Sequence, residues 1–205
     1  MRLIHNGLLI LFCLTSLVVA MESRKKEQGI RVECHGQLRH GIVAIGGETT
    51  GTTISFNRLT WELKLPDDAT RSFASEHHKQ PVTAVGTLRR VDGTQVPVRW
   101  ILEVDRLAVA DTKGHKAAAI ATVIGKLRHE ESGSGDAGNL IVEADGITWP
   151  LDFDHDKKLA EKARALVGKV ATIKGEVMRA AGSDSPRRMQ LRVDQLGPSD
   201  VANAE

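Results

Sequence analysis

Four short motifs occur twice in this chain, in the same order and at nearly the same spacing. The two members of each pair lie 88 or 89 residues apart. The pairs are GQLRH at 36–40 with GKLRH at 125–129, TWEL at 60–63 with TWPL at 148–151, TAVG at 83–86 with TIKG at 172–175, and VDRL at 104–107 with VDQL at 193–196. An ordered repeat of this kind indicates one structural module present twice. The sequence therefore predicts modules at 30–108 and 118–197, joined by a linker at 109–117.

The two ends of the chain lack the patterns of the modules. Residues 1–20 contain Arg2 and then an apolar run that ends with small residues at Val18 and Ala20, which is typical of a cleaved signal peptide. The run is shorter than the roughly 20 apolar residues of a membrane-spanning helix. We therefore predict cleavage and export to the periplasm or beyond, with a retained anchor as the alternative. Residues 21–29 and 198–205 are predicted to be a flexible segment and a tail.

Each module has the same predicted order of elements. Apolar and polar residues alternate at 30–38, 54–56 and 61–65, which predicts three strands. Carboxylates after Pro66 predict the start of a short helix, and Asp154 or Asp156 has this role in the second module. Two further alternating segments follow, at 82–88 and 100–104 in the first module. The predicted fold class is mainly β.

Three strands, a helix and two strands is the element order of the five-stranded OB barrel, and the chain resembles the OB-fold on that order and on its TAVG-type fourth strand. It is loosely similar to small OB-fold proteins of the bacterial periplasm, and its GGETTG loop at 46–51 resembles one in uncharacterised exported bacterial proteins. The resemblance implies two tandem OB-like barrels, each with one short helix between strands 3 and 4. OB-folds bind on strands two and three and the adjoining loops. The predicted partner-binding residues there are Arg39, Thr49, Thr50, Glu62 and Lys64.

The sequence contains no motif that specifies catalysis, a cofactor or a metal. Cys34 aligns with Val123, which indicates a buried thiol that acts as a small apolar side chain. Residues 152–163 begin like a calcium loop but lack its glycine and its final glutamate. We therefore predict no catalytic residue, no cofactor and no metal ligand.

Charge and aromatic content argue against nucleic acid as a partner. Lysine and arginine number 28 against 26 acidic residues, aromatic residues make up 3% of the chain, and tyrosine is absent. Trp61, Trp149 and Trp100 each have the inward parity of a core residue, which leaves none for stacking bases on the outer face.

The function that these observations favour is that of an exported, non-catalytic binding or adaptor protein. Its predicted partner is another protein or a component of the cell envelope. The alternative is a binder of a small ligand, an oligosaccharide or a metal on the outer barrel face. The sequence leaves the oligomeric state open.

Overall fold

The computed structural model describes residues 29–43, 48–94, 97–111, 116–130, 139–180 and 189–199. The predicted signal peptide at 1–20 lies outside the described residues, as do 21–28 of the predicted flexible segment and 200–205 of the tail. Within the described ranges, no helix is long and apolar enough to cross a membrane.

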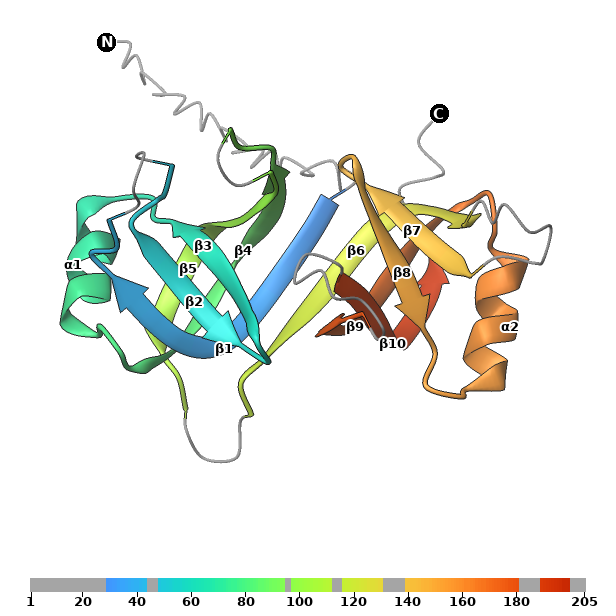
Figure 1. The fold of residues 1–205 in the computed structure, drawn as a ribbon. Helices are drawn as coiled ribbons and strands as arrows, with labels where there is room; N and C mark the ends of the chain where they lie inside the picture. The colour runs from blue at the N-terminus through green and yellow to red at the C-terminus, as the bar shows by residue number, and fades with distance from the viewer. Residues whose placement is uncertain are drawn as a thin grey trace, which may run out of the picture.

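The described residues form ten strands and two helices, coloured in chain order in Figure 1. The elements are β1 (Gly29–His40), β2 (Thr52–Phe56), β3 (Leu59–Lys64), α1 (Asp68–Glu76), β4 (Pro81–Val91), β5 (Arg99–Val109), β6 (Ala118–His129), β7 (Leu140–Ala144), β8 (Ile147–Asp152), α2 (Lys157–Ala165), β9 (Val170–Arg179) and β10 (Met189–Pro198). This order agrees with the predicted mainly β class and with a helix after the third strand of each half.

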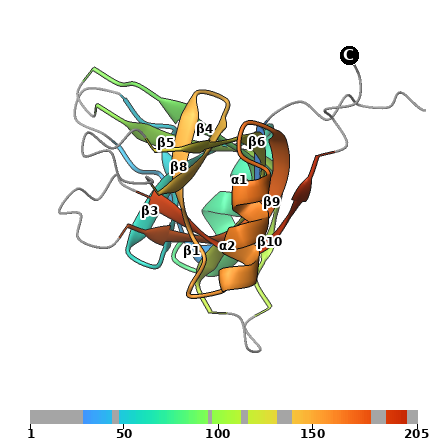
Figure 2. The same cartoon turned by 90° about the vertical axis from the view of Figure 1, so that its right-hand side faces the viewer.

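Local sequence explains where the strands and helices begin. In β1, the even-numbered residues from Ile30 to Leu38 are buried and their neighbours face outward, which follows the apolar alternation of the sequence. Asp67 caps α1 by accepting a hydrogen bond from the Thr70 amide at 2.8 Å. Asp156 caps α2 in the same way, by a bond of 3.0 Å from the amide of residue 159. The two helices lie at opposite ends of the molecule, and α2 stands in front of the strands in the end-on view (Figures 1 and 2).

The first half closes into a five-stranded barrel. β1 pairs with β2, β2 with β3, β3 with β5 in parallel, β5 with β4, and β4 with β1 again. Cys34 is buried in this barrel, and burial raises the pKa of its thiol. The largest fully buried side chain of the first half is Trp61, which contacts Phe56 edge to face at 4.6 Å between ring centroids.

The prediction of two tandem barrels required a separate sheet in the second half. The structure does not show one. β6 pairs with β7 and β9, β7 with β8, β8 with β10, and β10 with β9. However, residues 29–35 of β1 also pair with 118–124 of β6, so all ten strands belong to one sheet. The reason is that β2 covers only the second part of β1, so the first part of that edge has backbone groups that β6 satisfies.

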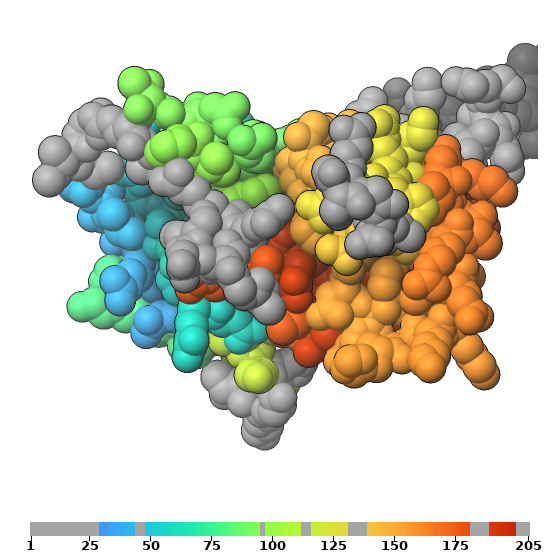
Figure 3. All heavy atoms as spheres, turned by 45° about the vertical axis from the view of Figure 1, so that its right-hand side comes forward, coloured from blue at the N-terminus to red at the C-terminus, as the bar shows by residue number. Residues whose placement is uncertain are grey.

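Side chains on both sides of this β1–β6 seam also join the halves. Trp100 of β5 contacts Trp149 of β8 edge to face at 6.2 Å between centroids. Arg89 of β4 pairs with Asp145 in the β7–β8 turn. In the space-filling view, green atoms of the first half lie directly against orange atoms of the second (Figure 3). The halves therefore make one continuous structure.

Candidate functional site

The predicted partner-binding residues lie on and beside the outer face of β1 and β3. Glu62 receives two hydrogen bonds from the Arg99 guanidinium, both at 2.7 Å, and a third from the Thr50 amide at 2.8 Å. The structure thus brings Thr50 and Glu62 together and adds Arg99, which was not among the predicted residues. Fork-shaped arginine–carboxylate contacts are among the stronger charged hydrogen bonds, so this group fixes the loop before β2 to the barrel.

The other three predicted residues do not join this group. Lys64 pairs with Glu103 at 3.0 Å. The Thr49 hydroxyl accepts a hydrogen bond from the Gly51 amide at 3.1 Å. Arg39 lies exposed on β1, opposite residue 53 of β2. Most of the predicted residues therefore hold the loop and the strands in place through contacts within the first half.

Charge pairing shifts the pKa values on this face in the direction that keeps its groups ionised. Partial burial raises the pKa of Glu62, but the hydrogen bonds from Arg99 and Thr50 outweigh it, so the net pKa lies below the ordinary value. The hydrogen bond from Lys64 lowers the pKa of Glu103. Two carboxylates of this face are therefore already neutralised by cations of the same half.

A hollow of about 200 Å³ lies on the corresponding face of the second half. The outward residues Ile141, Thr148 and Pro150 of β7 and β8 line it, and Trp149 and Trp100 form part of its wall. Met189 and one carboxylate, that of Glu130, complete the lining. Trp100 comes from the other half of the chain and is only partly buried, whereas Trp149 is 2% exposed. We call this space the Trp100 hollow.

The parity of Trp100 in its strand predicted a core residue, and its ring does pack against the core although it is only partly buried. It alternates with the buried residues Leu102 and Val104, which indicated an inward position. However, Trp100 lies at the beginning of β5, where it pairs with Arg90 of β4. At this position its ring contacts Trp149 of the second half. Met189, which lies 89 residues after Trp100, is 4% exposed and lines the same hollow.

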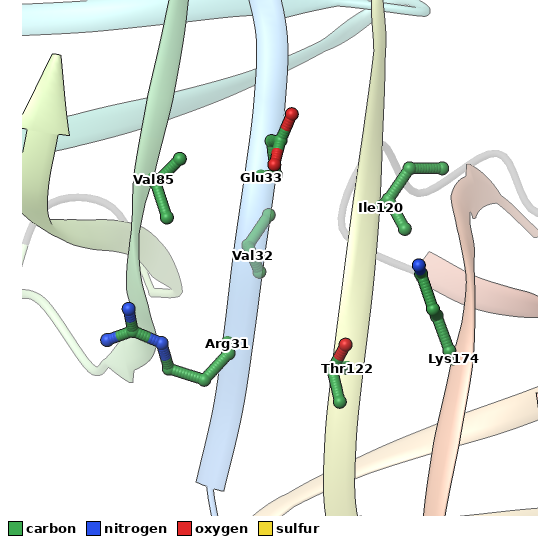
Figure 4. Close-up of a pocket in the computed structure, with 7 residues that line it drawn as sticks. All are labelled: Arg31, Val32, Glu33, Val85, Ile120, Thr122 and Lys174. Atoms are coloured by element: carbon green, nitrogen blue, oxygen red, sulfur yellow. The ribbon is translucent and has the colours of Figure 1, made fainter.

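A groove of about 320 Å³ runs over the seam where β1 meets β6 (Figure 4). Its labelled side chains come from four strands, and they are Val85 of β4, Arg31, Val32 and Glu33 of β1, Ile120 and Thr122 of β6, and Lys174 of β9. Arg31 is paired with Asp105, and Glu33 adds a second negative charge. The cations of this groove are thus largely balanced.

A larger cleft of about 580 Å³ lies between the β2–β3 turn of the first half and β9 with β10 of the second. Its lining includes four cationic side chains and one carboxylate, and we call it the cationic cleft. The cations are Arg58, Lys116, Arg179 and Arg192, and the carboxylate is Glu176. Sequence reasoning missed this cluster, because these residues come from widely separated segments. Among the described residues, no group of three potential metal ligands lies together.

No family model and no curated protein sequence matches the chain. Its fold is similar to two solved structures of the single-stranded DNA binding protein from Thermus aquaticus. The wild-type protein has a TM-score of 0.51 and 12% identity, with 84% of this chain and 94% of that chain covered. A deletion mutant of it has a TM-score of 0.52 and 11% identity, with coverage of 84% and 95%.

These similarities correct the prediction that nucleic acid is not a partner. The structures that this fold resembles belong to proteins that bind single-stranded DNA, so the fold gives no ground for excluding such a ligand. The prediction was wrong for two physical reasons. Charge balance over the whole chain says nothing about local clusters such as the cationic cleft. Trp100 packs against the core as its parity predicted, but it is only partly buried and also borders a hollow.

The five-stranded closed barrel and the similarity over most of both chains agree on the architecture. The chain has an OB fold, as its element order predicted.

Proposed function

We propose that this protein binds single-stranded nucleic acid on the face of β7 and β8, with a base stacked on Trp100 in the Trp100 hollow. The observation that carries the proposal is the place of Trp100. A partly buried indole stands over the strands that, in an OB fold, correspond to the usual ligand-binding face. The fold of known single-stranded DNA binding proteins supports the same ligand class.

The physical basis is the stacking of a base on an aromatic ring. Each such contact contributes about 1–3 kcal/mol and tolerates any base, because every base has a π-face. Pro150 and Ile141 give the hollow apolar walls, and Thr148 offers a hydroxyl for a hydrogen bond. Trp100 is held at its place by the edge-to-face contact with Trp149, so its ring needs little ordering on binding.

The proposal includes a second OB barrel built from β6 to β10. Its support is the cyclic order of pairings in that half, from β6 through β7, β8, β10 and β9 back to β6. On this proposal the predicted residues Arg39 and Lys64 lie on the equivalent face of the first barrel, where they serve as outer contacts.

The test is binding of a fluorescein-labelled deoxythymidine oligonucleotide, followed by fluorescence anisotropy at low salt. The Trp100→Ala variant should bind roughly 5- to 150-fold more weakly, because about 1–3 kcal/mol of stacking is lost. Trp100→Phe should retain most of the affinity, since a smaller ring still stacks. Val109→Ala is the control on the same strand, because Val109 is 53% exposed and lies outside the hollow.

Absence of binding by the native chain to deoxythymidine, deoxyadenosine and RNA oligonucleotides at low salt would refute the proposal. Equal affinity of the native chain and Trp100→Ala would show that the bases do not contact this hollow.

A further inference from the structure

We infer that the cationic cleft is a phosphate-binding site, separate from the Trp100 hollow and formed only where the two halves meet. It rests on the proposed function in one respect, which is that the phosphates are those of a nucleic-acid strand.

The shape of the cleft depends on a tight turn. Asn57 and Arg58 join β2 to β3, and Phe56 pairs with Leu59 on either side of them. Both turn residues have positive φ, 40° and 61°, as a two-residue hairpin turn with the right twist requires. The Asn57 amide donates a hydrogen bond of 3.0 Å to Glu176 of β9. This contact holds the turn over the second half and places Arg58 on the edge of the cleft.

The balance of charge inside the cleft is positive. Arg192 pairs with the one carboxylate of the lining, Glu176, and Arg58 and Lys116 add two further positive charges. That carboxylate is already occupied, because it pairs with Arg192 and accepts the hydrogen bond from Asn57. A concave site lined by one sign of charge concentrates counter-ions of the opposite sign. Phosphate groups satisfy such a site, since each offers several acceptor oxygens to arginine and lysine.

Several outward cations elsewhere in the molecule are each paired with one carboxylate. The bound pairs are Arg99 with Glu62, Lys64 with Glu103, and Arg128 with Glu143. These pairs leave little field for an anion. The cationic cleft is where several cations converge on one carboxylate.

Size indicates that the phosphate is part of a larger molecule. The volume of about 580 Å³ falls within the range of roughly 300–1,000 Å³ that pockets for organic ligands occupy. Met178 and the two alanines of the lining, Ala118 and Ala180, add apolar surface between the charges. A free inorganic phosphate would leave most of this space to water, whereas a sugar–phosphate chain would fill it.

The corresponding turn of the second half does not present a cation in this way. The turn between β7 and β8 is Asp145–Gly146, and Asp145 pairs with Arg89 of β4 instead of presenting a cation. On that side the halves meet through an ion pair that neutralises the arginine. We therefore expect one phosphate-binding site in each chain.

The experiment uses the full chain and a double variant, Arg58→Ala with Lys116→Ala. The control, Lys157→Ala with Lys158→Ala, removes the same charge from α2, at the end of the molecule. Affinity for a labelled deoxythymidine oligonucleotide is measured at several potassium chloride concentrations. For single strands, the slope of log K against log salt is about −0.7 for each phosphate neutralised. The double variant should reduce the magnitude of the slope by about 1.4, and the control should leave it unchanged.

A second arm measures tripolyphosphate binding by calorimetry, where the native chain should bind one molecule and the double variant should not. If the double variant and the control change the slope equally, only net charge matters and the inference is overturned. If the double variant binds the oligonucleotide like the native chain while Trp100→Ala fails, the cleft is not a phosphate site and the proposed function stands. If the native chain binds tripolyphosphate through Arg58 and Lys116 but binds no oligonucleotide, the cleft stands and the proposed function fails.

Discussion

Glu62 was predicted to bind a partner, and in the structure its carboxylate contacts Arg99 and Thr50 of the first half. Its side chain is 16% exposed and that of Arg99 14%, so the pair is largely shielded from water. The two hydrogen bonds from Arg99 and the one from Thr50 satisfy the carboxylate within the first half. A carboxylate held in this way stabilises the loop before β2, and its ionisation becomes linked to folding.

The first prediction concerns this linkage. Glu62→Gln should lower the free energy of unfolding at pH 7 by about 1.5–3 kcal/mol, the usual contribution of hydrogen bonds to a charged group. Because the pKa of Glu62 is below its ordinary value of 4.5 in the folded chain, the stabilisation is complete above that value. It is lost as the pH falls through the lower folded-state pKa, so the two proteins should become equally stable in acid.

Urea unfolding of the native chain and Glu62→Gln from pH 7 down to pH 3 measures this difference. Glu76→Gln, on the exposed end of α1, is the control and should match the native chain throughout. A gap that stays constant with pH would contradict the linkage.

At the scale of elements, two of the four repeated motif pairs coincide with β-bulges. In the β4–β5 ladder, the partners of Val85 and Gly86 are residues 106 and 104, so Asp105 is the extra residue. In the β9–β10 ladder, the partners of Gly175 and residue 174 are 193 and 195, so Asp194 is extra. The glycine opposite each bulge lets the backbones approach closely. The aspartate of each Val-Asp motif is thus the extra residue of a bulge, and the glycine opposite it allows the close approach of the two strands. The recurrence of the motifs in the sequence did not predict these bulges.

The second prediction tests this close approach. A Cβ atom at Gly86 would lie 2.0 Å from the carbonyl oxygen of Glu103, which is backbone and cannot move aside cheaply. Gly86→Ala should therefore destabilise the chain by about 1–3 kcal/mol or more, as overpacking does. A Cβ atom at Gly197, in β10, would meet nothing within 4 Å, so Gly197→Ala is the matched control.

Thermal and urea unfolding of both variants provide the measurement. Gly197→Ala should fall within about 0.5 kcal/mol of the native chain. If Gly86→Ala is equally stable, the bulge adapts to a side chain and the close approach is not required.

At the scale of the whole molecule, the antiparallel β1–β6 ladder joins the two halves of the chain. In the ladder Val32 faces Ala121, and these two residues are 89 apart, the same spacing as the repeated motifs. On either side of this pair, Arg31 faces Thr122 and Glu33 faces Ile120, as an antiparallel pairing requires. Contacts across it join each hairpin turn to the opposite half, through Arg89 with Asp145 and Asn57 with Glu176.

The third prediction is that the halves unfold together. Seven residue pairs join β1 to β6, and Trp100 packs on Trp149 across the halves, so separating them would expose backbone groups and aromatic surface. Differential scanning calorimetry should show one transition whose calorimetric and van't Hoff enthalpies agree. Two resolved transitions would instead indicate halves that are stable independently.

Much of the fold could be predicted from the sequence, because inward and outward positions alternate along each strand. Alternation placed Cys34 and Trp61 in the core, and carboxylates marked the helix starts. Of the predicted site, Thr50 and Glu62 do come together. Arg99, which binds Glu62, was missed because partners across the parallel β3–β5 pairing are far apart in the chain.

The sequence by itself determined the element order, the core positions and the OB fold, because burial of apolar side chains depends on local periodicity. Only the tertiary structure decided that β1 pairs with β6, because backbone hydrogen bonds use groups that every residue shares and leave no pattern in the side chains. The β1–β6 pairing brings the halves together, so that the turn with Arg58 lies over β9. Trp100 and Trp149 also contact each other between the two halves. Both proposed binding surfaces therefore depend on how the halves meet, which neither half encodes alone.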